Sequence, residues 1–164
     1  MDNTSENRLE GLTPPALLPP HYFVACLVGI PALWLLLPLT PVLAPHQQVY
    51  GLGVGLLSLG VGVWIAIQGS RQFGKAKTNI IPFTPASCLV TDGVFRISRN
   101  PMYTGMVLAL AGAALLSNQL WTWGLVVVFT LIIRYGFIAR EEQQMLATFG
   151  DDYLGYQQRV RRWL

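Results

Sequence analysis

Two long stretches without a charged side chain constrain this chain more than any other feature of its sequence. Residues 11–70 contain no Asp, Glu, Lys or Arg, and neither do residues 100–133. A helix needs about 20 mostly apolar residues to cross the hydrocarbon core of a bilayer. The first stretch is too long for one crossing helix, and the second is also longer than one helix needs. The sequence therefore predicts two helical hairpins, in an all-α integral membrane protein with four transmembrane helices.

The composition agrees with this class and excludes several others. Charged residues make up 12% of the 164 residues and apolar residues 52%, whereas soluble domains carry about a quarter charged residues. These values exclude a disordered chain, a collagen and a disulfide-rich scaffold. Cys26 and Cys88 stand far apart without metal-ligand spacing, so we expect neither a disulfide nor a metal site. The net charge of +3 is typical of basic cytoplasmic loops, and we expect no nucleic-acid partner.

Prolines, glycines and charges divide the chain into five segments of a single domain, residues 1–164. We expect a polar, Pro-rich leader at 1–20, a first hairpin at 21–70, a loop at 71–100, a second hairpin at 101–139 and a tail at 140–164. The predicted spans within the hairpins are Tyr22–Leu43, Val49–Gln68, Pro101–Ser117 and Leu120–Ala139. Pro31 and Pro38 should kink the first span.

Small residues recur at helical spacing in two of the predicted spans. Small side chains let helices approach closely in lipid. The second span has a G-x-x-x-G pair at Gly51 and Gly55. The third span has a small residue at every fourth position, namely Gly105, Ala109, Ala113 and Ser117. We expect these positions to form a smooth ridge against a neighbouring helix.

Basic residues set the expected orientation. The loop at 71–100 carries five Lys or Arg and the tail at 140–164 carries four. The short connection between the two spans of each hairpin carries none. Loops rich in Lys and Arg stay on the cytoplasmic side, so we expect the long loop and both termini there. The tail should continue the last span, break at Gly150 and end in a cytoplasmic helix. That helix should lie on the membrane interface, with Tyr153, Tyr156 and Trp163 on its apolar face.

The polar side chains that could do chemistry gather at the cytoplasmic ends of the second hairpin. The segment 93–105 closes the long loop, and the adjacent carboxylates of Glu141 and Glu142 follow the last span. Such a pair is either a solvated helix start beside Arg140 or a site that holds a cation or hydroxyl groups. Arg134 is predicted near the membrane edge, where it either reaches for lipid headgroups or has a function.

Three sequence patterns in this region resemble one enzyme superfamily. They are Thr78-x-x-x-Pro82-x-x-Pro85-x-x-x-Leu89-Val90-x-x-Gly93, Arg99-Asn-Pro-Met-Tyr-Thr-Gly105 and Glu141-Glu142-x-x-Met145-x-x-x-Phe149-Gly150-x-x-Tyr153-x-x-Tyr156-x-x-x-Val160. In this order and at these spacings, the chain from residue 71 onward resembles the isoprenylcysteine carboxyl methyltransferase and phospholipid N-methyltransferase superfamily. The first two spans match it in hydropathy alone.

The resemblance implies a small membrane methyltransferase that uses S-adenosylmethionine. It places the cofactor at the cytoplasmic ends of the last two spans, covered by the C-terminal helices. The positions that match the family's cofactor contacts are Ser87, Cys88, Leu89, Val90, Phe95, Asn100, Pro101, Met102, Tyr103, Glu141 and Glu142. A carboxylate pair suits the cofactor's ammonium, sulfonium and ribose hydroxyl groups. Arg99 and the backbone amides at a helix start suit its carboxylate.

Two positions depart from the prenylcysteine branch of the superfamily. Asn100 stands where those enzymes usually carry His, so the segment looks more like the phospholipid branch and many bacterial relatives. Phe137 occupies the position of an arginine that contacts the substrate in the prenylcysteine enzymes. Arg134 and Arg140 are the candidates to replace that arginine as substrate contacts.

The sequence thus predicts methyl transfer to a lipid-like or hydrophobic acceptor at the cytoplasmic interface of a bacterial inner membrane. The acceptor group stays open between a carboxylate, an amine and a thiol, and membrane lipids are expected partners. A nicotinamide-dependent membrane reductase of the sterol type is one alternative, and it would need basic residues for the cofactor phosphates. A non-enzymatic membrane protein, such as a transporter subunit, is the other. It would carry polar residues at the bilayer midplane, where these spans have almost none.

Overall fold

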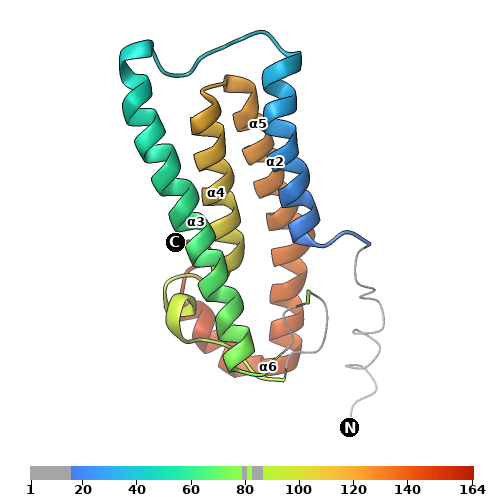
Figure 1. The fold of residues 1–164 in the computed structure, drawn as a ribbon. Helices are drawn as coiled ribbons and strands as arrows, with labels where there is room; N and C mark the ends of the chain where they lie inside the picture. The colour runs from blue at the N-terminus through green and yellow to red at the C-terminus, as the bar shows by residue number, and fades with distance from the viewer. Residues whose placement is uncertain (1–15, 79–80, 83–86) are drawn as a thin grey trace.

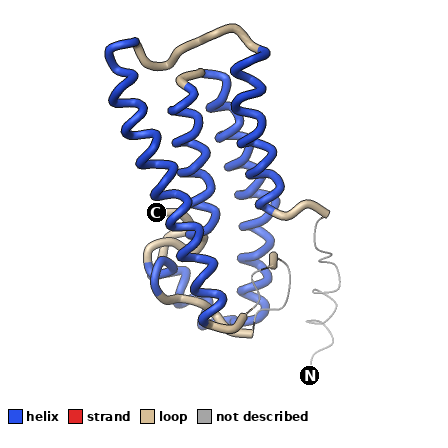
Figure 2. The backbone as a smooth tube through the Cα atoms, viewed as in Figure 1, coloured by secondary structure: helices blue, strands red, loops and turns tan. Residues whose placement is uncertain are grey.

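The chain folds into a helical bundle in a computed structural model, which describes residues 16–78, 81–82 and 87–164 (Figures 1 and 2). The elements are α2 (Pro19–Leu36), η1 (Pro45–Gln47), α3 (Gln48–Lys75), η2 (Gly93–Arg96), α4 (Pro101–Ser117), α5 (Leu120–Leu131), the π-helical segment η3 (Ile132–Ile138) and α6 (Ala139–Arg159). Helices α2 to α5 stand side by side, and α6 lies at one end of the bundle (Figure 1). The all-α prediction is confirmed for the described residues.

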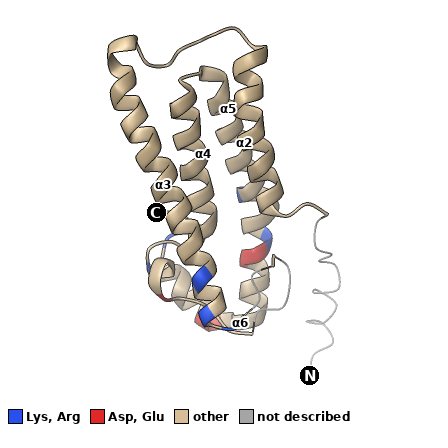
Figure 3. Ribbon diagram, in the orientation of Figure 1, with Lys and Arg blue, Asp and Glu red and all other residues tan. Residues whose placement is uncertain are grey.

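The outer surface of this bundle is apolar. Three helices are long and apolar enough to cross a membrane, Pro19–Leu36, Pro45–Lys75 and Leu120–Arg159, and α4 is a shorter apolar helix. Large side chains such as Leu36 and Leu57 are exposed along the bundle. The charged residues of the bundle gather toward the end where α6 lies (Figure 3). An extended apolar surface of this kind is compatible with a membrane protein.

The first hairpin differs from the prediction at its helix ends. Helix α2 accommodates Pro31 but stops at Leu36, two residues before Pro38. A proline disfavours helical geometry in the residue that precedes it, so the kink predicted at Pro38 is a helix end instead. Helix α3 runs to Lys75, well beyond the predicted span, and the first residues of the predicted cytoplasmic loop are therefore helical.

Side chains of the α4–α5 turn hold the connection between α2 and α3. The Thr40 N–H donates to Gln119 Oε1 at 2.7 Å, and the Leu43 N–H donates to Asn118 Oδ1 at 2.8 Å. The Asn118 amide in turn donates to the Leu43 oxygen at 3.1 Å. These bonds satisfy backbone groups that have left the helix, and they tie the two hairpins together at the end away from α6.

Helices α3 and α4 pack backbone against backbone. A Cβ atom on Gly62 would lie 2.5 Å from both the Gly105 oxygen and the Ala109 nitrogen, and one on Gly112 would lie 2.6 Å from the Gly55 oxygen. No side chain fits at these distances, which is how small residues bring helices together in membranes. The predicted ridge is confirmed at Gly105, Ala109 and Gly55. This packing fixes the start of α4 against α3.

A dry core lies where α4 meets α5 and η3. Leu110, Phe129, Ile133 and Ile138 are each 0% exposed, and Cys26 of α2 packs against them. Because this core continues into η3, it also fixes the start of α6, which follows directly.

Candidate functional site

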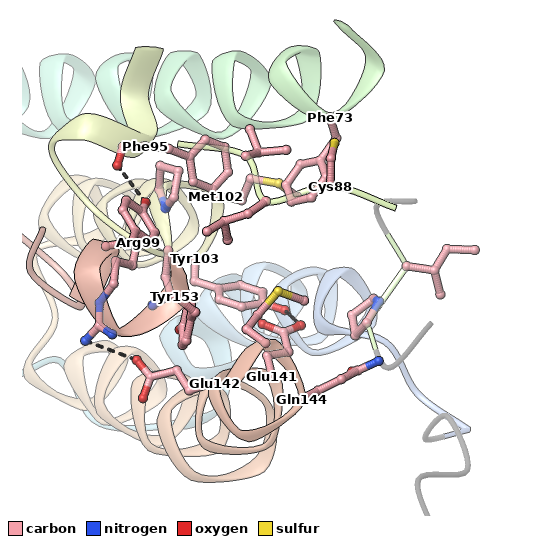
Figure 4. A pocket seen from close by; sticks show the side chains of 18 residues that line it. Phe73, Cys88, Phe95, Arg99, Met102, Tyr103, Glu141, Glu142, Gln144 and Tyr153 are labelled. Carbon is pink, nitrogen blue, oxygen red and sulfur yellow. Dashed lines mark hydrogen bonds and ion pairs between the residues drawn. The ribbon is translucent and has the colours of Figure 1, made fainter. Parts of the chain in front are cut away.

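A pocket with polar and apolar walls opens at the charged end of the bundle, between the segment after α3, the start of α4 and α6 (Figure 4). Most side chains around it are aromatic or aliphatic. Its lining residues are Phe73, Ile81, Pro82, Cys88, Leu89, Val90, Phe95, Arg99, Asn100, Pro101, Met102, Tyr103, Glu141, Glu142, Gln144, Met145, Tyr153 and Tyr156. Within the described ranges, no group of three or more His, Cys, Asp or Glu side chains could hold a metal ion.

The structure brings together almost every residue predicted to contact the cofactor. All of them except Ser87 line the pocket. Ser87 is exposed, and its backbone N–H donates to the Thr78 hydroxyl at 3.0 Å. The lining residues that were not predicted as contacts are Phe73, Ile81, Pro82, Gln144, Met145, Tyr153 and Tyr156. Gln144 and Met145 follow Glu141 by three and four residues, a helical spacing that could have identified them.

The start of α4 places Tyr103 beside Glu141. Pro101 occupies the first helical turn, where a missing N–H leaves no helical bond unmade. Tyr103 is 7% exposed, and its hydroxyl donates to Glu141 Oε1 at 2.8 Å (Figure 4). Burial of the Glu141 carboxyl raises its pKa to about 7, the hydrogen bond from Tyr103 opposes that rise, and the Glu142 charge adds to it. Glu141 therefore changes charge near neutral pH.

Glu142 has entirely different partners. Arg162 donates from Nε to Glu142 Oε1 at 2.9 Å and from Nη2 to Oε2 at 2.5 Å. Arg99 Nη2 lies 3.3 Å from Oε1, and the Glu142 side chain is 12% exposed. The two adjacent carboxyl groups thus differ in environment: Glu141 meets a tyrosine, whereas Glu142 meets two arginines.

The π-helical segment η3 decides which face of α6 meets the pocket. Val126, Phe129 and Ile133 are buried at a spacing of i, i+3 and i+7, and an uninterrupted α-helix would continue this face to Arg140 at i+14. The i→i+5 turns of η3 shift the register by about one residue. As a result Arg140 is exposed and Glu141 lines the pocket.

The two arginines predicted as substrate contacts lie outside the described pocket residues. Arg134 is exposed, and its guanidinium carbon lies 5.6 Å from the centre of the Tyr135 ring. Arg140 is exposed on the outer side of α6. Arg99, which was predicted to contact the cofactor, is the arginine that lines the pocket among the described residues.

Helix α6 breaks at Gly150, as predicted. Gly150 has φ 49° and ψ −122°, a conformation that favours glycine. Beyond the break, Tyr153 and Tyr156 line the pocket, and the Tyr156 hydroxyl donates to the Phe95 oxygen at 2.7 Å. Trp163 packs against the core. The aromatic face predicted to lie on the membrane surface is therefore turned into the protein, because it covers the pocket and η2.

An apolar groove lies beside the pocket, between α2, α3 and α4. Its lining residues are Phe23, Gly62, Val63, Ala66, Ile67, Ser70, Met102, Gly105, Met106 and Ala109. Met102 lines both the groove and the pocket. The two hollows therefore share the Met102 side chain as a wall at the start of α4.

Comparisons with known proteins identify a family. Residues 50–152 match the family described as phospholipid methyltransferase. A Haemophilus influenzae protein described as uncharacterized is 41% identical over 63 residues, which is 38% of this chain and all of that protein. Proteins of Oryza sativa subspecies indica and japonica, described as probable protein-S-isoprenylcysteine O-methyltransferases, are 32% identical over 117 residues, 68% of this chain and 59% of theirs. No solved structure matches the chain.

The family match covers more than half of the chain and contains most of the elements that build the pocket. It takes in nearly all of α3, all of α4 and α5, and α6 as far as the break. The alignment with the Oryza sativa proteins, by contrast, spans little more than half of their length. On this evidence the chain is a membrane methyltransferase that belongs to the phospholipid methyltransferase family.

Proposed function

We propose that the protein transfers a methyl group from S-adenosylmethionine to a lipid-like acceptor at the charged end of the bundle. The observation that carries this proposal is the meeting of opposite charges in one pocket, since the Glu141 carboxyl and the Arg99 guanidinium both line it. The cofactor carries an ammonium and a carboxylate at its amino-acid end, and its sulfonium adds a second positive charge. Family membership supports methyl transfer independently.

Arg99 fits the carboxylate of such a cofactor. Its side chain is 11% exposed, and its Nε and Nη1 atoms are buried without a hydrogen-bond acceptor among the described residues. A buried donor without an acceptor is unfavourable, and a carboxylate oxygen of the ligand can accept a charge-assisted hydrogen bond from either of these nitrogens. The rings of Phe73 and Phe95, which stand edge to face with centroids 5.5 Å apart, offer an apolar wall for the adenine.

The reaction needs alignment more than acid–base catalysis. Bound S-adenosylmethionine would supply an activated methyl group. Tyr103 holds the Glu141 carboxyl at the pocket, where its ionised form favours a neighbouring positive charge. The apolar walls exclude water from the reacting atoms. A carboxylate acceptor needs no base, whereas an amine must first release a proton.

The apolar groove supports an acceptor that carries a hydrocarbon chain. Its α3 side runs from Gly62 to Ser70, about 12 Å along the helix axis. Because Met102 lines both hollows, a chain that lies in the groove would bring its polar head to the pocket. The acceptor would then enter sideways from the bilayer.

The membrane topology is part of the same proposal. We infer that α2 to α5 all cross the bilayer and that the charged end of the bundle and both termini face the cytoplasm of a bacterial cell. The basic residues Arg71, Lys75, Lys77, Arg96 and Arg99 all belong to the connection between α3 and α4 or to the last turns of α3. Their position supports this orientation.

Cofactor affinity should rise with pH around neutrality. The Glu141 carboxyl is mostly protonated below its raised pKa of about 7, and its ionised form attracts the positive end of the cofactor. Between about pH 6 and pH 8 we expect the affinity for S-adenosylhomocysteine to rise about tenfold. Calorimetric titration across this range measures it, with Glu141→Gln as the variant that should lose the pH dependence. A flat profile for the unaltered protein would contradict the role of Glu141.

Glu141 should make the stability of the protein without ligand fall as the pH rises, whereas it makes the affinity for the cofactor rise. Because burial raises the pKa of this group from 4.5 to about 7 in the folded state, the folded chain keeps a proton that the unfolded chain releases. The contribution of Glu141 to stability is therefore complete below about pH 4.5 and is lost as the pH rises through about 7.

Filling the groove should weaken acceptor use and spare the cofactor. Val63→Phe puts a ring into the groove, and we expect the KM for a long-chain acceptor to rise about tenfold with unchanged affinity for S-adenosylhomocysteine. Val61→Phe makes the same change at an exposed position of α3 outside the described groove residues. Equal KM values for the two variants would exclude the groove as the acceptor site.

Transfer of a labelled methyl group tests the proposed function directly. Purified protein in phosphatidylethanolamine vesicles would receive methyl-labelled S-adenosylmethionine, and parallel samples would contain an S-prenylcysteine or a long-chain thiol. We expect label in one of the three lipid products and none with Glu141→Gln. No product from any acceptor class, in protein that binds S-adenosylhomocysteine, would contradict transfer to a lipid-like acceptor.

A further inference from the structure

The C-terminal tail supplies an arginine that the sequence patterns did not mark. Arg162 lies just beyond the end of α6. Its side chain donates two hydrogen bonds to the carboxylate of Glu142, one to each oxygen. A two-point bond between a guanidinium and a carboxylate is the strongest geometry for such a pair. Arg99 meets the same carboxylate through one nitrogen at 3.3 Å. Glu142 is therefore bound mainly by Arg162.

Backbone contacts hold the tail in place without help from the Arg162 side chain. The Arg99 N–H donates to the Arg161 oxygen at 2.9 Å. The Asn100 side-chain amide donates to the Arg162 oxygen at 3.0 Å, and the Ser98 hydroxyl donates to the same oxygen at 3.4 Å. The segment that precedes α4 and the tail are thus joined directly, and a changed side chain at position 162 leaves these bonds available.

The bond between Arg162 and Glu142 leaves two nitrogens of Arg99 without an acceptor. Nε and Nη1 of Arg99 are buried and find no acceptor among the described residues, although the Glu142 carboxylate, which Arg162 binds through both oxygens, stands close by. If Glu142 lacked its bond to Arg162, its two oxygens would be open to Arg99, whose planar fork matches a carboxylate in two-point geometry. Arg99 would then turn its remaining donors toward Glu142 and away from the pocket.

We propose that Arg162 is a positioning residue that occupies Glu142 and thereby leaves Arg99 to bind the carboxylate of the ligand. The inference rests on the proposed function, because it needs a ligand with a carboxylate, as S-adenosylmethionine has. It divides the acidic pair by role: Glu141 faces the positive charge of the ligand, and Glu142 accepts the second arginine. Arg162 acts through Glu142 and Arg99 and touches no reacting atom.

Two ligands that differ in their amino-acid end separate this role from a structural one. S-adenosylhomocysteine carries the carboxylate, whereas 5′-methylthioadenosine has the same nucleoside and thioether without the amino acid. For Arg162→Gln we expect about tenfold weaker binding of S-adenosylhomocysteine, the loss of one charge-assisted interaction, and unchanged binding of 5′-methylthioadenosine. Arg161→Gln, which removes the same charge from an exposed neighbour, should bind both ligands like the unaltered protein.

A double-mutant cycle identifies the route of the effect. In a Glu142→Gln background, Arg162→Gln should cause no further loss of affinity for S-adenosylhomocysteine, and Arg162→Lys in the unaltered background should recover part of it. Equal weakening of both ligands by Arg162→Gln would show a structural role and overturn the inference, as would no weakening of either. Failure of the unaltered protein to bind either ligand would instead remove the proposed function, and this inference with it.

Discussion

Glu141→Gln is expected to weaken cofactor binding strongly while the protein stays folded. The substitution keeps the size of the side chain and an oxygen that can accept the hydrogen bond from the Tyr103 hydroxyl. It removes the negative charge from a pocket that must hold an ammonium and a sulfonium. Loss of one partner of a buried charge pair costs a few kcal/mol, so we expect at least about a 100-fold loss of affinity for S-adenosylhomocysteine. Calorimetric titration measures the loss, and the labelled-methyl assay should show no product.

Glu142→Gln is the matched control for this prediction. It makes the same change one residue away, in a carboxylate that already has Arg162 and Arg99 as partners. We expect a much smaller loss of affinity than for Glu141→Gln, because the charge removed is one that the protein itself neutralises. Equal losses in the two variants would mean that the two glutamates act as one cation-binding pair and that the division of roles is wrong.

Gly105→Leu is expected to have the largest effect on stability. A Cβ atom at Gly105 would lie 2.8 Å from the Ala66 nitrogen and closer still to the Gly62 oxygen. Both obstacles are backbone atoms of α3, so no side-chain movement relieves the clash, and α3 and α4 must separate. Overpacking of this kind is strongly unfavourable, and we expect the melting temperature in detergent to fall by about 5 to 10 °C.

Gly60→Leu provides the comparison for Gly105→Leu. A Cβ atom at Gly60 meets nothing within 4 Å, although the residue lies in the same helix as Gly62. We expect this variant to melt within about 2 °C of the unaltered protein. Because Leu is a better helix former than Gly, equal melting of the two variants would mean that close packing of α3 against α4 at Gly105 does not stabilise the protein.

The site was largely predictable because its parts lie in short, ordered patterns. The segment 99–103 and the two glutamates after the last span were identified from spacing and resemblance, and the structure gathers them around one pocket. Hydropathy and the charge-free stretches likewise indicated the helices. These features depend on local sequence or on composition over a whole span, which a single chain reveals.

Which side of α6 faces the pocket could not be predicted in the same way. Arg140 was a candidate substrate contact because Phe137 stands where the prenylcysteine enzymes carry an arginine, and a regular helix would carry the buried face of Phe129 and Ile133 on to Arg140. The π-helical segment η3 turns it outward and brings Glu141 in. Apart from Arg134, the residues of η3 do not differ in polarity from those around them in a way that marks a change of period.

The burial of the aromatic face of the tail could not be predicted for a related reason. Tyr153 and Tyr156 share one helical face, and such a face is equally suited to a membrane surface and to a protein interior. The structure buries both against the pocket, with the Tyr156 hydroxyl bonded to Phe95. Choosing between the two requires knowledge of η2 and the start of α4, which lie more than 50 residues earlier in the chain.

The central claim is that the pocket between α4 and α6 binds S-adenosylmethionine. Calorimetric titration of detergent-purified protein with S-adenosylhomocysteine tests this claim most directly, with NADPH titrated in parallel because a nicotinamide-dependent reductase is the rival enzyme. We expect saturable binding of S-adenosylhomocysteine and none of NADPH. Binding of NADPH alone, or of neither compound, would contradict this claim.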